Sequence, residues 1–280
     1  MIALFSLLCW ADATGLGAAA AGWWLTPVAV MIAAGAAVEV SRMTLDRGLA
    51  LNTPLVAGSA ALLPLVAMLA AGLPAATPLS IIGCVALALT AVLGGWFVIE
   101  LAGYRRSAAA AARLAAGFLA MAAIGLPLAF MVSLRVLGGP GPAGLIPLVS
   151  MVAVVKGGDI AAYLVGSSIG RRRMAPLVSP GKTWEGAAAS ITASVAVAWL
   201  LLEASGWTTV RPWGGWPIYG AAVGLAGMLG DLSESLIKRE LGVKDSGRML
   251  GGLGGFLDLV DAPLFAAPVA WLLWALGTQA

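Results

Sequence analysis

The chain has 280 residues, of which 61% are hydrophobic and only 10% are charged. A soluble domain carries about 25% charged residues, so this composition excludes an ordinary soluble protein and predicts an integral membrane protein. Histidine is absent, and the two cysteines, Cys9 and Cys84, lie in apolar runs. These counts exclude a His-containing catalytic triad and argue against a zinc site or a disulfide framework. Any catalysis must therefore use carboxylates, Lys or Arg side chains, hydroxyls and metal ions.

Nine apolar segments are long enough to cross a bilayer as helices, which needs about 20 residues each. In chain order they are 1–19, 23–41, 52–73, 79–101, 110–136, 143–167, 184–203, 214–236 and 256–276. The predicted fold class is therefore all-α, a polytopic membrane protein with about nine transmembrane helices. The first segment is the weakest of the nine because Asp12 interrupts it. In the eighth segment, Gly220, Gly224, Gly227 and Gly230 predict close helix packing.

The basic residues predict the orientation of these segments. Of the 16 Lys and Arg residues, 13 fall on one side: 12 lie in the connections that follow the second, fourth, sixth and eighth segments, and Arg113 lies in the first turn of the fifth segment. Cytoplasmic loops are enriched in Lys and Arg, so this side is predicted to face the cytoplasm, with the amino terminus inside. We expect the chain to lie in the inner (cytoplasmic) membrane. Topology and anionic headgroups account for these cations, so the net charge of +3 requires no nucleic-acid partner.

The acidic residues divide the chain into two regions. Only four of the 13 acidic residues precede residue 150, and nine follow it. We therefore predict that residues 1–140 form an N-terminal scaffold of transmembrane helices. Residues 141–280 are predicted to form the catalytic transmembrane region, with a polar site on its cytoplasmic side.

The first polar element of this second region is Asp159 with Tyr163. The two residues are four positions apart and therefore share one face of a helix. Lys156 precedes Asp159 by three positions. The element is consistent with an intramembrane Lys–Asp pair as well as with a functional site.

The second element is the segment 179–186, which reads SPGKTWEG. Gly-Lys-Thr suggests a phosphate-binding P-loop, but Pro176 stands where that motif needs its first glycine. Two interpretations remain. Lys182 and Thr183 belong either to a basic loop that binds phosphate at a helix start, or to a capped helix with an interfacial lysine.

The third element begins in the eighth segment, where Asp231, Glu234, Ser235 and Lys238 share one helical face. Charged side chains in an apolar helix are costly and usually functional. A glycine-rich turn at 251–255 then leads to two further carboxylates on one face of the next helix.

These two carboxylates, Asp258 and Asp261, could converge with Asp231. Three carboxylates form a suitable oxygen site for Mg²⁺, and a second, monovalent cation such as K⁺ could join it. Lysines and arginines near such a site would hold phosphates. The pattern indicates phosphoryl or nucleotidyl transfer, although interfacial ion pairs that fix helix ends would place the same residues here.

The spacing of these residues resembles the signature of the phosphatidate cytidylyltransferase family, also called CDP-diacylglycerol synthases. The matching positions are Ser235, Lys238, Arg239, Lys244, Asp245, Gly247, Leu250, Gly251, Gly254, Gly255, Asp258 and Asp261. Three upstream blocks also resemble the family: Asp159 to Gly166, Ser179 to Gly186, and Gly230 to Ser235. The resemblance covers roughly residues 140–280.

The chain departs from the family signature at three positions. Leu253 replaces a histidine, Leu259 replaces an arginine, and Gly181 replaces a lysine. The reaction that the resemblance implies does not need this histidine as a base. Its nucleophile is a phosphate monoester, which has a second pKa of about 6 and is largely dianionic at neutral pH. We therefore expect Leu253→His to be tolerated.

The resemblance implies transfer of a cytidylyl group from CTP to phosphatidate in the bilayer, giving CDP-diacylglycerol and diphosphate, with Mg²⁺ at the cytoplasmic face. It implies as catalytic residues Asp231, Asp258, Asp261, Lys238 and Asp245, with Asp231, Asp258 and Asp261 as the metal ligands. It implies as substrate-binding residues Lys182, Thr183, Ser235, Arg239, Lys244, Asp159 and Tyr163. By analogy with the family, a homodimer is plausible.

Two other functions remain open from the sequence. One is a different CTP-dependent lipid enzyme, such as a polyprenol kinase or an archaeol-type cytidylyltransferase. The other is an ion-coupled transporter, although transporters usually show internal repeats and carboxylates near the bilayer midplane. Here no repeat is visible, and the acids gather near predicted cytoplasmic ends.

Overall fold

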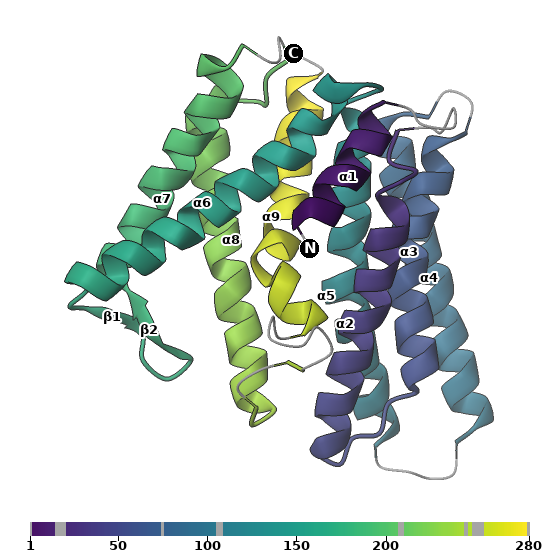
Figure 1. Cartoon of the computed structure of the whole chain (residues 1–280). Coiled ribbons are helices and arrows are strands. Elements are labelled where there is room, and N and C mark those ends of the chain that lie inside the picture. Colours follow the sequence, from purple (N-terminus) through teal and green to yellow (C-terminus); the bar gives the residue numbers. More distant parts are fainter. Residues whose placement is uncertain are drawn as a thin grey trace.

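The computed structural model describes residues 2–14, 21–73, 76–104, 109–206, 210–243, 246–247 and 255–278. The predicted site residues Lys244 and Asp245 lie outside the described residues, as does Leu253. The described chain is a bundle of helices with one small β-hairpin (Figure 1). The predicted fold class, an all-α membrane protein, is confirmed.

The helices follow the apolar segments of the sequence closely. They are α1 (Ile2–Ala13), α2 (Thr26–Asp46), α3 (Thr53–Ala71), α4 (Pro78–Ala102), α5 (Ala110–Leu137), η2 (Pro142–Leu145), α6 (Ile146–Ile169), α7 (Trp184–Trp199), η3 (Leu200–Ala204), α8 (Gly215–Glu240) and α9 (Phe256–Gly277). Proline stands in the first turn of α2, α3, α4 and α6, where its missing N–H has no intrahelical partner to lose. The hairpin pairs β1 (Arg173–Ala175) with β2 (Ser179–Thr183), antiparallel.

The predicted count of nine spans is not confirmed. Seven helices in the described part of the chain are long and apolar enough to cross a membrane. Helix α8 has 26 residues but is not among these seven. Helix α1 has only 12 residues, about 18 Å of helix, and a hydrocarbon layer is about 30 Å thick. The described residues of the first segment therefore do not form a spanning helix.

Asp12 anchors α1 instead of interrupting a span. Its carboxylate pairs with the guanidinium of Arg135 in the last turn of α5, and it accepts the Gly22 N–H at 2.9 Å. Arg135 also donates to the carbonyl of Gly139 at 2.6 Å. Both side chains are buried. Removal of one partner from a buried ion pair typically costs about 3–5 kcal/mol, so this pair ties α1 to the bundle.

Helix α9 belongs to both hydrophobic cores of the molecule. The first core packs α2, α3, α4 and α5 against Leu257, Val260 and Leu264 of α9. The second core packs α6, α7 and α8 against a different set on α9 that includes Ala262 and Ala266. Figure 1 shows α9, in yellow, between the two groups of helices.

Glycines allow the helices of the second group to approach closely, as the sequence predicted. A Cβ atom on Gly220 would lie 2.6 Å from the Cα of Val195 in α7. A Cβ atom on Gly224 would lie 2.4 Å from the hydroxyl oxygen of Ser194. Any larger side chain at these positions would push α8 away from α7.

Most described cations lie at one end of the bundle. Arg47 follows α2, Arg113 is in the first turn of α5, and Lys238 and Arg239 are in the last turn of α8. These helix ends and the hairpin occupy the lower half of Figure 1. The opposite end carries Arg135 at the end of α5.

Candidate active site

Three carboxylates from two helices meet beside the charged end of α8. Asp231 and Glu234 come from α8, and Asp261 comes from the second turn of α9. One oxygen of each residue lies within 4.8 Å of the others. Gly230 permits this approach, because a Cβ atom there would lie only 2.7 Å from the Asp261 carbonyl oxygen. We call these three residues the carboxylate cluster.

Two lysines flank the cluster on different sides. Lys182 of β2 places its Nζ 2.8 Å from Oδ2 of Asp231, so the hairpin contacts α8 through this ion pair. The Nζ of Lys238 lies 2.9 Å from Oε1 of Glu234. Lys238 also forms an ion pair and a hydrogen bond with Asp258. The positive charges therefore offset part of the repulsion among the acids.

Asp258 lies beside the cluster and not within it. Its Oδ2 accepts the Gly255 N–H at 2.8 Å, which caps the first turn of α9, while its other oxygen binds Lys238. The structure thus brings together Asp231 and Asp261 of the predicted metal set and adds Glu234 to them. Sequence reasoning placed Glu234 on the right helical face but not among the site residues, although its spacing of three from Asp231 was the available signal.

The carboxylate cluster fits a divalent cation. Mg²⁺ and similar hard cations prefer carboxylate oxygens. Glu234 is buried, and its Oε1 lies 2.9 Å from the Lys238 ammonium, so this ion pair holds the carboxylate beside the other two acids. The cluster and the ion pairs beside it comprise five carboxylates and three ammonium groups, a formal net charge of −2: Asp159, Asp231, Glu234, Asp258 and Asp261 against Lys156, Lys182 and Lys238. One Mg²⁺ ion would neutralise this excess.

Asp159 and Tyr163 of α6 differ in their surroundings, because only Asp159 forms an ion pair with a neighbour on the helix. Asp159 pairs with Lys156, whose Nζ lies 3.3 Å from Oδ2 of Asp159. Tyr163 is 74% exposed on the outside of the helix. The Lys–Asp pair allowed by the sequence is therefore present, and Tyr163 points to the surroundings of the protein.

Thr183 is engaged in the packing of two helices. It is buried, and its hydroxyl oxygen accepts the Gly186 N–H at 3.1 Å, which caps the start of α7. A Cβ atom on Gly166 or Gly170 of the preceding segment would meet Thr183 at 3.2 Å or less. This is the capped-helix interpretation of the segment 179–186, while Lys182 next to it reaches the carboxylate cluster.

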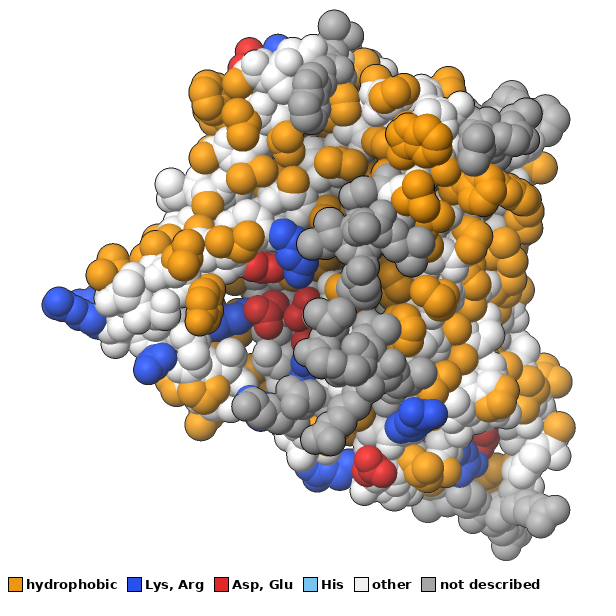
Figure 2. All heavy atoms as spheres, in the orientation of Figure 1, with side chains coloured by type: hydrophobic (Ala, Val, Ile, Leu, Met, Phe, Trp, Pro, Cys, Tyr) orange, Lys and Arg blue, Asp and Glu red, His pale blue; other side chains and the backbone are white. Residues whose placement is uncertain are grey.

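Ser235 and Arg239 surround the cluster on α8. The Ser235 hydroxyl oxygen lies 3.5 Å from Oδ1 of Asp231. Arg239 is exposed, and its Nε donates to the carbonyl of Val178 at 3.2 Å, which ties the end of α8 to the hairpin. Figure 2 shows acidic and basic side chains gathered below α6 on a face that is otherwise mainly apolar.

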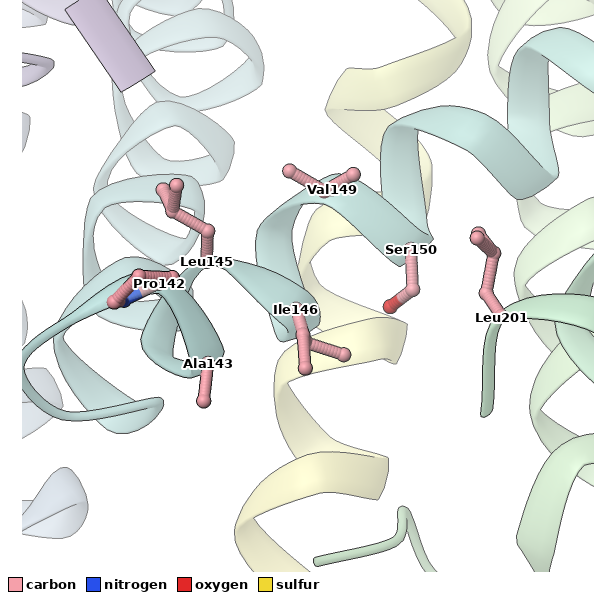
Figure 3. Close-up of a pocket in the computed structure, with 7 residues that line it drawn as sticks. All are labelled: Pro142, Ala143, Leu145, Ile146, Val149, Ser150 and Leu201. Atoms are coloured by element: carbon pink, nitrogen blue, oxygen red, sulfur yellow. The ribbon is translucent and has the colours of Figure 1, made fainter. Parts of the chain in front are cut away.

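An apolar pocket lies at the other end of α6, away from the charged site. It has a volume of about 460 Å³ and is lined by η2, the start of α6 and Leu201 (Figure 3). Its one hydroxyl, on Ser150, is hydrogen-bonded with the Tyr219 hydroxyl at 2.9 Å. No charged side chain lines this pocket, so it does not offer the chemistry of the carboxylate cluster.

The chain is similar to one known protein family over most of its length and to individual relatives over about half of it. The sequence model of the cytidylyltransferase family matches residues 2–276. A protein of Brucella melitensis named phosphatidate cytidylyltransferase is 40% identical over 151 residues, which cover 52% of this chain and 53% of that protein. Proteins of the same name are 39% identical over 127 residues in Haemophilus influenzae and 38% identical over 138 residues in a Synechocystis species. These two alignments cover 44% and 43% of the respective relatives. The chain thus spans about half the length of the curated relatives that it matches.

Proposed function

Because the chain belongs to the cytidylyltransferase family, we propose that it is a phosphatidate cytidylyltransferase, which converts CTP and phosphatidate into CDP-diacylglycerol and diphosphate. The observation that carries this proposal is the carboxylate cluster with Lys182 and Lys238 on its two sides. Acids that suit a metal ion and cations that suit phosphates lie together at the charged end of apolar helices. This combination suits a reaction between a nucleoside triphosphate and a phospholipid.

The proposed reaction is a single displacement at phosphorus. A phosphate oxygen of phosphatidate attacks the α-phosphorus of CTP, a new P–O bond forms, and the bond to the β-phosphate breaks to release diphosphate. The attacking monoester is largely dianionic at neutral pH, since its second pKa is about 6, so no strong base is needed. Positioning of the two substrates and neutralisation of their charges can therefore supply the catalysis.

The cations of the site would hold the phosphates. An ammonium group has three donors, so Lys182 and Lys238 can keep their carboxylate partners and still donate to a phosphate oxygen. We propose Arg239 and Lys244 as further phosphate ligands. Ser235, Thr183, Asp159 and Tyr163 complete the proposed substrate-binding set.

Asp231, Asp261 and Glu234 would hold Mg²⁺, and Asp258 remains a proposed ligand that Lys238 neutralises in this structure. A bound Mg²⁺ would offset phosphate charge and orient the diphosphate leaving group. Asp245 is proposed as an organiser of the neighbouring cations. A second, monovalent cation such as K⁺ would fit the same acidic surroundings.

The site is proposed to face the cytoplasm. The end of the bundle that carries most cations, including the hairpin, would lie on that side of the inner membrane. Ile160 and Leu164, which follow Asp159 on α6, are 62% and 59% exposed and would let a lipid reach the site sideways from the bilayer. Residues 1–140 would then act as scaffold and residues 141–280 as the catalytic region. We also propose that the protein forms a homodimer.

The test is CTP-dependent formation of CDP-lipid by purified protein. We expect CDP-diacylglycerol and diphosphate in equal amounts from CTP and phosphatidate, and no product when Mg²⁺ is omitted. Polyprenol and an archaeol-type phospholipid serve as competing acceptors. A phosphorylated polyprenol as the main product would identify a kinase, and the absence of CDP-lipid with every acceptor would overturn the proposal.

A further inference from the structure

Glu39 is a buried carboxylate of the scaffold region that binds the start of α9. It lies in α2 and is only 1% exposed. Its Oε1 accepts the Phe256 N–H at 2.9 Å, and its Oε2 accepts the Leu257 N–H at 3.0 Å. The Ser246 hydroxyl lies 3.4 Å from Oε2 and donates to it. A carboxylate from one region of the chain therefore receives three donors from the other.

This contact stabilises the helix terminus that carries the site residues. The first N–H groups of a helix have no intrahelical acceptor, and the positive end of the helix dipole favours a negative charge there. Asp258 accepts the Gly255 N–H, so Glu39 and Asp258 together satisfy three successive N–H groups. Asp261 lies one turn further along the same helix. The position of this first turn in the bundle, and its rotation about the helix axis, therefore decide where Asp258 and Asp261 point.

Two glycines leave the space that the Glu39 carboxylate occupies. A Cβ atom on Gly255 would lie 2.5 Å from Oε2 of Glu39, and one on Gly247 would lie 2.9 Å from Oε1. At the other end of the same connection, Arg47 of the α2 terminus donates from Nε to the carbonyl of Leu241 at 2.9 Å. Helix α2 thus holds both the end of α8 and the start of α9.

We propose that Glu39 is a positioning residue for cytidylyl transfer: it fixes the first turn of α9 so that Asp258 and Asp261 meet Lys238 and the carboxylates of α8. This inference rests on the proposed function, because it assigns a role within that reaction. It also assigns part of the active-site architecture to the region that the sequence predicts as scaffold.

The decisive variant is Glu39→Gln, which keeps the shape of the side chain. A glutamine has one acceptor oxygen, and its amide N–H₂ would face a backbone N–H donor. We expect kcat to fall about 10- to 100-fold, as is typical when a group that orients metal ligands is changed. The KM for CTP at saturating Mg²⁺ should change less than about threefold, since Glu39 itself touches no substrate. Amide hydrogen exchange of the peptide 255–260 should become faster.

The matched control is Asp12→Asn, because Asp12 is also a buried carboxylate that accepts backbone N–H groups, at the opposite end of the bundle. This variant should unfold at a lower temperature, yet its folded fraction should keep the kcat of the parent protein and the exchange rate of the peptide 255–260. If Glu39→Gln fails to fold, Glu39→Asp, which keeps the charge but is one methylene shorter, takes its place.

Unchanged kcat or unchanged exchange at 255–260 in the Glu39 variant would overturn the inference. An equal loss of kcat in the folded fractions of the Glu39 and Asp12 variants would also overturn it, since the effect would then be general. If the parent protein forms no CDP-lipid, the proposed function fails by itself. The exchange measurement would still show whether Glu39 holds the start of α9.

Discussion

Lys238 joins the two helices that carry the acids of the candidate site. Its ammonium lies between Glu234, four residues earlier on α8, and Asp258 at the start of α9. A nearby positive charge stabilises a carboxylate that burial would otherwise disfavour, so Lys238 offsets the cost of burial for both acids at once. The position of this side chain sets the geometry of acids that come from different helices.

Loss of a charged oxygen at Asp231 or Asp258 is expected to abolish the proposed reaction. Asp231→Asn removes a carboxylate of the cluster, and Asp258→Asn removes one of the two carboxylate partners of Lys238. We expect turnover of phosphatidate to fall at least about 100-fold in each variant, with normal membrane insertion. The measurement is CDP-diacylglycerol formation by purified protein, with Asp46→Asn, at the exposed end of α2, as the control. Near-normal turnover of the Asp258 variant would contradict its assignment to the site.

Leu259, which stands where the family signature has an arginine, packs in apolar surroundings. In this chain the residue is partly buried against the first hydrophobic core, while its neighbour Asp258 faces Lys238. A leucine at this position contributes apolar packing where an arginine would contribute charge. The sequence shows the replacement, and the structure shows that the new side chain packs against the first hydrophobic core.

At the scale of elements, the hairpin β1–β2 has a role that the sequence did not predict. From the sequence, the segment 179–186 is interpreted as a basic loop or as a capped helix start, and no strand is predicted there. The two short strands of the hairpin pair through the backbone, and the pairing ends at Thr183, the cap of α7. This arrangement explains how Lys182, from a connection, reaches Asp231 on α8.

The approach of α8 to α9 depends on Gly230, and its replacement should damage the site. A Cβ atom in Gly230→Ala would lie 2.7 Å from a backbone oxygen of α9, so the two helices must separate. We expect activity to fall at least about tenfold, because small misplacements of reacting groups are costly in rate. The melting temperature should fall as well.

The matched control for this helix contact is Gly94→Ala. Gly94 lies in α4, where a Cβ atom would meet nothing within 4 Å. Alanine is a better helix former than glycine by about 1 kcal/mol, so this variant should be at least as stable as the parent. Equal activity in the two alanine variants would mean that α8 and α9 do not need their close contact.

Helices of spanning length were largely predictable, because hydropathy is a local property of the chain. The contacts that build the site were less predictable, since they join residues far apart in the sequence. Spacing on a single helix indicated that Asp231 faces a site, and the chemistry of carboxylates indicated its convergence with Asp261. The bond from Phe256 to Glu39 spans 217 positions, and that from Arg135 to Asp12 spans 123, so no local pattern reveals them.

At the scale of the whole molecule, the distribution of cations predicts one orientation in the membrane. Two exposed leucines in connections at opposite ends can report it: Leu177, in the hairpin and 92% exposed, and Leu73, after α3 and 55% exposed. In a background with Cys9→Ala and Cys84→Ala, a cysteine at 177 should react with a membrane-impermeant maleimide only from the cytoplasmic side. A cysteine at 73 should react only from outside. The opposite pattern would place the carboxylate cluster on the side of the membrane away from cellular CTP.

The division of the chain into scaffold and catalytic regions describes where the acidic residues lie, but contacts between the two regions cross it. Acidic residues are concentrated after residue 150, as the sequence shows. Yet Glu39 and Arg47, from the scaffold region, bind backbone groups at both ends of the α8–α9 connection. Neither region contains all the contacts that shape the candidate site.

The membership of α9 in both hydrophobic cores has a consequence for biosynthesis. Chains are made from the amino terminus, so α9 is the last of the described helices to leave the ribosome. Until it inserts, both groups of helices lack one wall, and the acids of α8 lack Asp258 and Asp261. A nascent or truncated chain is therefore incomplete in packing and in chemistry at the same time, and the arrival of one helix completes both.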